Sequence, residues 1–201
     1  MRIWTQLHRI EIAPSFLLFL CAYYYFDPWQ SFTPFLLSVV AHEFGHLMVL
    51  KLMGIHINRL SFRATGAIIC TPPLPYRQEL LAASAGPTVN LLLLALFIHQ
   101  APVLSFVNLC LLLYNLLPFY PLDGGRILRA LLFLVLNEKT ASLLEKLIAS
   151  LCVLLLICIA CYLTCVYHVG LWPVLVCGVL LVRISGTIFP QKRVDKLHSP
   201  C

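Results

Sequence analysis

The chain has 201 residues, of which 61% are hydrophobic and only 11% are charged, and its mean hydropathy is +0.91. Soluble domains carry about 25% charged residues, so this composition excludes an ordinary soluble domain and predicts an integral membrane protein. The net charge of +6 comes from 14 Lys and Arg against 8 Asp and Glu. In a membrane chain such an excess is typical of loops that face anionic lipid. The sequence has no aromatic-basic module of the kind that binds nucleic acid.

Six apolar segments are candidates for transmembrane helices, each of which needs roughly 20 residues. They are 12–26, 31–50, 80–98, 100–122, 147–167 and 169–182. The first and the last are short for a full crossing. We therefore expect an all-α polytopic membrane protein with about six transmembrane helices. We expect one membrane-embedded domain over 1–190 and a short cytoplasmic tail over 191–201.

The second segment contains the sequence His42-Glu43-Phe44-Gly45-His46. Residues four apart share a helix face, so His42 and His46 can bind one metal ion together. Glu43 is next to them, where a carboxylate can move the proton of a nucleophilic water. Ionisable groups at bilayer depth are costly and usually mark function. This segment therefore predicts a metal site.

The segment 55–76 is too polar to span a membrane. Its alternating apolar residues predict a small β-hairpin at the cytoplasmic interface. An exposed edge of this hairpin could bind an extended peptide as one more strand. The candidate substrate-binding residues are Ile57, Leu60, Phe62 and Gly66. An ordinary basic loop is the alternative interpretation.

The third segment contains Ser84-Ala85-Gly86-Pro87-Thr88-Val89-Asn90. Small residues let helices approach closely in lipid, so we interpret 84–88 as a helix-packing stretch. Asn90 is different, because its amide requires a partner within the bilayer. We interpret it as a structural polar residue that orients a neighbouring helix or the metal site.

The end of the fourth segment reads Asn-Leu-Leu-Pro-Phe-Tyr-Pro-Leu-Asp-Gly-Gly-Arg over residues 115–126. Irregular backbone at this depth is tolerated only when it is buried in protein or lines a wet cavity. A zinc site built on two histidines needs a third protein ligand and an open position for water. Asp123 is the best candidate among the few acidic residues. The alternative is that Asp123 caps a helix that begins near Gly124.

Charge placement predicts the topology. With the amino terminus in the cytoplasm and six crossings, the cytoplasmic pieces are 1–11, 51–79, 118–146 and 183–201. All 14 Lys and Arg fall in these pieces, as the positive-inside rule requires. Both termini are therefore expected in the cytoplasm.

Three motifs together resemble a known family. They are HEFGH in an early span, a central Gly-Pro-x-x-Asn, and the later Asn-x-x-Pro-x-x-Pro-Leu-Asp-Gly-Gly-Arg. This combination resembles the site-2 protease family of intramembrane zinc metalloproteases, peptidase family M50, from about residue 35 to 130. The compact size and the lack of a PDZ domain are most similar to the stage IV sporulation branch. Many members of that branch carry a CBS domain, for which this chain has no room.

The resemblance implies one Zn²⁺ per chain, with His42, His46 and Asp123 as ligands and Glu43 as general base and acid. Asn115 matches a family asparagine near the metal and would steady the substrate carbonyl or its oxyanion. The resemblance also implies a three-helix catalytic core, formed here by 31–50, 80–98 and 104–117.

The expected function is therefore hydrolysis of peptide bonds in membrane-associated or transmembrane proteins, near the cytoplasmic side of a bacterial cytoplasmic membrane. The sporulation branch implies a sigma-factor precursor as substrate and a membrane inhibitor or regulator as a further partner. A membrane zinc transporter and a non-catalytic membrane scaffold are the alternatives. A transporter needs several polar sites along a path, whereas the polar groups here gather at one depth.

Overall fold

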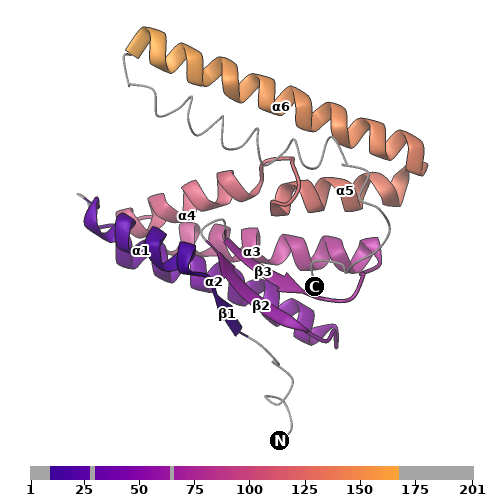
Figure 1. The fold of residues 1–201 in the computed structure, drawn as a ribbon, viewed down its shortest axis with the longest axis horizontal. Coiled ribbons are helices and arrows are strands. Elements are labelled where there is room, and N and C mark those ends of the chain that lie inside the picture. Colours follow the sequence, from indigo (N-terminus) through magenta and orange to yellow (C-terminus); the bar gives the residue numbers. More distant parts are fainter. Residues whose placement is uncertain (1–9, 28–29, 64–65, 168–201) are drawn as a thin grey trace, which may run out of the picture. The chain divides into compact units, whose positions relative to one another are not determined.

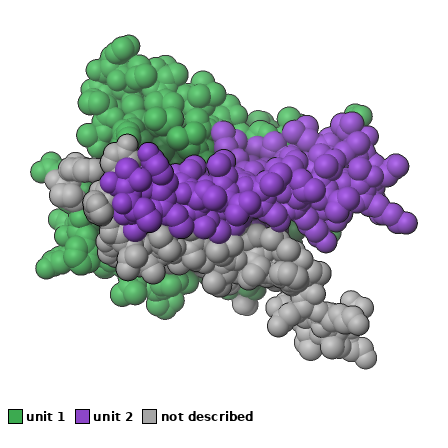
Figure 2. All heavy atoms as spheres, turned by 90° about the horizontal axis from the view of Figure 1, so that it is seen from above, with its two compact units in different colours: residues 1–115, 198–201 green, residues 116–197 purple. Residues whose placement is uncertain are grey.

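The computed structural model of the chain describes residues 10–27, 30–63 and 66–167 (Figure 1). This part is mostly helical, with one small sheet. The expected sixth span, 169–182, and the tail, 191–201, lie outside the described residues. The chain divides into two compact units, residues 1–115 with 198–201 and residues 116–197 (Figure 2). Each unit is described by itself.

Unit 1 contains four helices. They are α1 (Pro14–Tyr25), α2 (Phe32–Leu52), α3 (Tyr76–Phe97) and α4 (Pro102–Asn115). Helices α1 and α4 each begin with a proline, whose fixed φ suits the first helical position and whose missing N–H needs no partner there. Helices α2, α3 and α4 contact one another pairwise and form the centre of this unit.

Helices α2 and α3 approach each other closely at Gly45. A Cβ on Gly45 would meet Val89 Cγ2 at 2.8 Å and the carbonyl oxygen of Ala85 at 3.1 Å. Small residues permit such contact between helices in lipid. The glycine within the histidine motif therefore brings α3 against the helix face that carries His42 and His46.

The sheet in unit 1 confirms the expected hairpin and adds a strand to it. Strands β2 (Arg59–Arg63) and β3 (Gly66–Cys70) pair antiparallel, and β1 (Ile10–Ile12) pairs parallel with β2 (Figure 1). The order is β1-β2-β3, so β2 is the central strand. Arg59 Nη1 lies 3.6 Å from Glu11 Oε2 across the β1–β2 pair.

Two details of the predicted hairpin are wrong. Residues 55–58, including Ile57, form no strand, although Asn58 N donates to the carbonyl oxygen of Cys70 at 2.9 Å. Strand β2, with Leu60 and Phe62, is not an exposed edge, because β1 pairs with the side of β2 that was expected to be free. Within the described residues, the two edge strands are β1 and β3, and β3 begins at Gly66.

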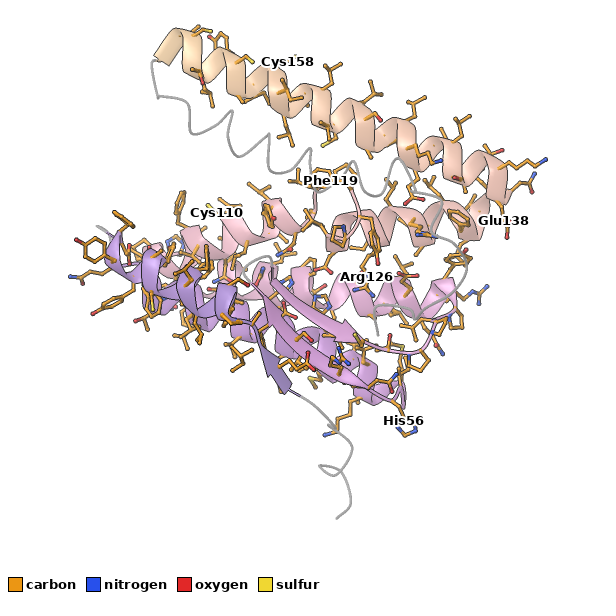
Figure 3. All side chains as sticks on the ribbon, viewed as in Figure 1. His56, Cys110, Phe119, Arg126, Glu138 and Cys158 are labelled. Atoms are coloured by element: carbon orange, nitrogen blue, oxygen red, sulfur yellow. The ribbon has the colours of Figure 1, made fainter. Side chains whose placement is uncertain are left out.

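Unit 2 contains α5 (Asp123–Val135) and α6 (Glu138–Tyr167), which pack against each other. The loop before α5 contributes Phe119 and Leu122 to an apolar cluster with Ala149 and Val153 of α6. Figure 3 shows Phe119 in this loop and Arg126 on α5. Helix α6 begins nine residues before the predicted span at 147, because hydropathy marks only the apolar part of a helix whose first turns are charged.

Three of the described helices, α2, α3 and α6, are long and apolar enough to cross a membrane. Helices α1 and α4 are apolar but shorter, with 12 and 14 residues. Helix α4 ends at Asn115 rather than at 122, because Pro118 and Pro121 prevent its continuation. The described residues thus give a mostly helical membrane fold with a small sheet, and they leave the count of six spans as an expectation.

Candidate metal centre

His42 and His46 lie on one face of α2 and are only 6% and 5% exposed. Their Nε2 atoms are 3.1 Å apart, and the two rings are nearly perpendicular. Two Zn–N bonds of 2.0–2.1 Å at a tetrahedral angle place the nitrogens about 3.3 Å apart. The separation of the two Nε2 atoms therefore fits two ligands of a single zinc ion.

The Nδ1 atoms of both rings have partners on α3. His46 Nδ1 lies 2.7 Å from the carbonyl oxygen of Ala82, an acceptor, so Nδ1 carries the proton and donates. The side-chain amide of Asn90 lies 3.0 Å from His42 Nδ1. Asn90 is fully buried. Helix α3 therefore fixes the orientation of both imidazole rings.

Gly86 leaves the space in front of the two histidines open. A Cβ on Gly86 would clash with His46 Nε2 and would lie 2.6 Å from His42 Cε1 and Nε2. Ala82, Gly86 and Asn90 are spaced by four and so share one face of α3. That face provides a carbonyl acceptor, an empty position and an amide, each directed at the histidine pair.

Asp123 is the first residue of α5 and is 7% exposed. Its Oδ1 lies 3.9 Å from Arg126 Nη1. The N-cap position of α5 belongs to Leu122, and no side chain makes a capping hydrogen bond there. Asp123 is therefore in the first turn of α5 and is not its N-cap residue.

The two glycines after Asp123 allow the preceding loop to pack on the first turn of α5. A Cβ on Gly124 would meet the backbone of Leu116 and would lie 2.6 Å from the carbonyl oxygen of Leu117. A Cβ on Gly125 would meet the backbone of Phe119. The two glycines thus allow the close packing between the loop and the start of α5, and this packing fixes the position of Asp123 relative to the loop.

His42 and His46 of unit 1 and Asp123 of unit 2 are all buried and are of the residue types that bind metal ions. Two imidazole nitrogens and one carboxylate oxygen match the donor set of catalytic zinc, with a fourth position left for water or substrate. The donor set and the empty position at Gly86 both fit zinc.

The remaining candidate residues lie at different places. Glu43 follows His42 on α2 and is half-buried, and Asn115 is the last residue of α4. Leu60 is 5% exposed, and the ring of Phe62 packs 5.7 Å from the ring of Phe16. The side chains of Leu60 and Phe62 therefore face the protein, and β2 lies between β1 and β3, so strand pairing with a substrate is left to an edge strand such as β3.

Two contributors to this centre differ from the expectation from sequence. Gly86, expected only to pack helices, lies against both histidines, and the backbone carbonyl of Ala82 is the partner of His46. The spacing of Gly86 four residues before Asn90 was the available signal, since it places both on one helix face. No sequence signal identifies a backbone carbonyl as the partner of a histidine.

Comparison with known proteins agrees with this geometry. Residues 95–159, which include Asn115 and Asp123, match the model of Peptidase family M50. The structure resembles the site-2 protease from Methanocaldococcus jannaschii with a TM-score of 0.64 and 24% identity, over 94% of each chain. The resemblance to the site-2 protease family is confirmed. At this identity the structural likeness carries the fold alone.

Curated relatives of peptidase family M50 match about half of the chain. A zinc metalloprotease of Methanocaldococcus jannaschii is 39% identical over 108 residues, which is 47% of this chain and 32% of the relative. Stage IV sporulation protein FB of Bacillus subtilis is 31% identical over 117 residues, which is 52% of this chain and 39% of the relative. The chain thus spans well under half of the length of these relatives.

Proposed function

We propose that this chain is an intramembrane zinc metalloprotease. It hydrolyses peptide bonds of membrane-associated or transmembrane proteins near the cytoplasmic side of the membrane. The observation that carries the proposal is the buried His42–His46 pair, whose Nε2 atoms are 3.1 Å apart and face the empty position at Gly86. Asp123 is the proposed third ligand. The matched relative in Methanocaldococcus jannaschii is named a zinc metalloprotease, which supports this assignment.

The protein side chains have separate roles in the proposed reaction. When bound, zinc polarises the scissile carbonyl and activates a water as nucleophile. Glu43, next to His42 on α2, takes the proton of that water and passes it to the leaving amine. The carbonyl of Ala82 accepts from His46 Nδ1 and holds that ring with Nε2 toward the metal. Asn115 steadies the substrate carbonyl or the oxyanion that develops from it.

The proposed topology has six transmembrane helices with both termini in the cytoplasm. Its support is the distribution of Lys and Arg, all of which fall in the four predicted cytoplasmic pieces. The loop between α4 and α5 and the sheet lie on the cytoplasmic side in this topology. The amino-terminal product is then expected to be released to the cytoplasm when the substrate is anchored by a later span.

The proposed substrate is bound in an extended form. A helix hides its carbonyl groups in hydrogen bonds, so cleavage requires local unwinding. The outer edge of β3 (Gly66–Cys70) can pair with such an extended segment, since backbone pairing tolerates many side chains. The match to stage IV sporulation protein FB favours a sigma-factor precursor as the proposed substrate. A membrane inhibitor or regulator is a further proposed partner.

The proposal is tested by co-expressing the chain with a panel of candidate membrane-associated precursors. Wild type is compared with Glu43→Gln, which keeps the shape of Glu43 but removes its proton-accepting charge. Wild type is expected to give a shortened product, and Glu43→Gln none. Zinc uptake into sealed vesicles without cleavage of any membrane peptide would favour a transporter and would contradict the proposal.

A further inference from the structure

We propose that Asn90 is a positioning residue that sets the tautomer of His42. Its side-chain amide oxygen accepts a hydrogen bond from His42 Nδ1–H and so keeps Nε2 unprotonated for the metal. The inference rests on the proposed zinc site and adds a residue that is neither a ligand nor a proton carrier. It starts from the 3.0 Å contact between the Asn90 amide and His42 Nδ1.

A neutral imidazole has one N–H, and the nitrogen that binds a metal must be the other one. The two Nε2 atoms lie 3.1 Å apart, so metal binding there requires both Nδ1 atoms to carry the protons. Each buried Nδ1–H then needs an acceptor. The carbonyl of Ala82 serves His46, and the Asn90 amide lies within hydrogen-bond distance of His42 Nδ1.

The structure places the amide nitrogen of Asn90, Nδ2, against His42 Nδ1. In that arrangement Nδ2–H donates to Nδ1, and the imidazole proton sits on Nε2, where it can donate to His46 Nε2. The site is then closed by a hydrogen bond between its own ligands. Turning the amide by 180° presents Oδ1 to His42, transfers the ring proton to Nδ1 and leaves both Nε2 atoms as ligands.

Within the described residues, no hydrogen bond to Asn90 Oδ1 has to be broken when the amide turns. Asn90 Oδ1 is buried and has no hydrogen-bond partner within the described part of the chain. The two ends of an amide have nearly the same shape, so both orientations occupy the same space. The contact with His42 therefore decides the orientation of the Asn90 amide. Metal binding at His42 Nε2 requires Asn90 Oδ1 to face His42 Nδ1.

Asn108 provides a matched control. It is also fully buried and lies on α4. Its amide donates to Ser38 Oγ at 2.8 Å and to the carbonyl oxygen of Leu104 at 2.9 Å. Ser38 is one helical turn before His42 on the same face of α2. Asn108 is thus a fully buried asparagine like Asn90, but neither of these two hydrogen bonds involves a histidine.

The experiment measures zinc affinity of the purified full chain by competition with a chelator. Asn90→Leu and Asn90→Ala remove the acceptor and are expected to weaken zinc binding by about 10–100-fold, as for other partners of metal-bound histidines. Asn90→Asp keeps an acceptor oxygen and should retain affinity within about threefold of wild type. Asn108→Leu should retain it as well. In zinc-free samples, imidazole ¹⁵N shifts should show more Nδ1–H tautomer of His42 in Asn90→Asp than in Asn90→Leu.

The outcomes separate this inference from the proposed function. If wild type binds zinc through His42 and both acceptor-free variants bind it equally well, Asn90 has no positioning role. Asn90 also has no positioning role if Asn90→Asp binds zinc as weakly as Asn90→Leu. In that case the loss comes from disturbed packing at Asn90 and not from the missing hydrogen-bond acceptor. If zinc binding by wild type does not change in His42→Ala, the proposed zinc site itself is wrong. Should Asn90→Leu fail to accumulate, the comparison of Asn90→Ala with Asn90→Asp gives the same decision.

Discussion

Gly86 of α3 lies directly against His42 of α2, so closely that a Cβ on Gly86 would come within 2.6 Å of His42 Nε2. Gly86→Ala should therefore fill the position where the metal is expected. Overpacking of this kind costs about 1–3 kcal/mol, so zinc affinity should fall by about fivefold or more, with a parallel loss of cleavage. Zinc content and cleavage in the same samples check this.

Thr88→Ala is the control for Gly86→Ala. Thr88 is on the same helix, is exposed, and its hydroxyl only donates to the carbonyl oxygen of Ser84. This change should leave zinc content unaltered. A Gly86→Ala variant with stoichiometric zinc and normal cleavage would show that the metal is not held between the histidines and α3.

Asp123→Ala should lower both bound zinc and cleavage, because two histidines alone hold the metal poorly. Asp123→Asn keeps one oxygen donor but loses the charge, so partial zinc content with little cleavage is expected. Metal analysis of the purified variants measures this.

Arg126→Gln provides the comparison for Asp123, since it removes only the arginine 3.9 Å from the Asp123 carboxylate. It should keep most of the zinc. Stoichiometric zinc in Asp123→Ala would mean that another residue supplies the third ligand.

Local spacing predicted the histidine pair but not the whole centre. His42 and His46 are four residues apart, so helical periodicity alone puts them on one face. Asp123 is far along the chain, and it was identified as a ligand from the scarcity of acidic residues and from the resemblance between motifs, not from local spacing. The sequence identified Asn90 as a polar group in need of a partner, yet it could not name His42 as that partner, because the answer depends on how α3 packs on α2.

The sheet shows a second limit of sequence reasoning. Alternation at Leu60 and Phe62 predicted the strand that is β2, but the other alternating piece, Ile55 and Ile57, forms no strand, and β2 pairs instead with β3 (Gly66–Cys70). Strand β1 is only three residues long and joins from the amino terminus. A three-residue alternation is too short to distinguish a strand from the start of an apolar helix, so the central place of β2 could not be foreseen.

Tags at the two termini should both be accessible from the cytoplasm, whereas a reporter at 99–101 should lie on the opposite side. The reason is that every Lys and Arg falls in the predicted cytoplasmic pieces. Protease protection or a cysteine-labelling reagent that does not cross membranes measures this. Termini on opposite sides would reduce the six crossings to an odd number.

Proline should have different effects in β2 and β3. Phe62→Pro changes the central strand, and proline is poorly accepted there, so protein level, zinc content and cleavage should fall together. Phe62→Leu should be mild, since it keeps the backbone and loses only the ring contact with Phe16.

In β3, neighbouring residues direct their N–H groups to opposite sides of the strand. Of Ile68→Pro and Ile69→Pro, one should therefore disturb the pairing with β2, and the other should keep zinc but lose cleavage. Cleavage and zinc content measured side by side distinguish the two. Normal cleavage in both variants would mean that β3 does not bind the substrate.

The short apolar helices of unit 1 have a consequence for the lipid around them. At 1.5 Å per residue, α1 and α4 are only about 18 and 21 Å long, whereas the hydrocarbon layer is about 30 Å thick. A bilayer adapts to such hydrophobic mismatch by thinning locally. His42 lies near the middle of α2, and a thinner bilayer would shorten the distance that water must travel to reach it. For the proposed protease, the deformed membrane would then be part of the solvent supply for hydrolysis.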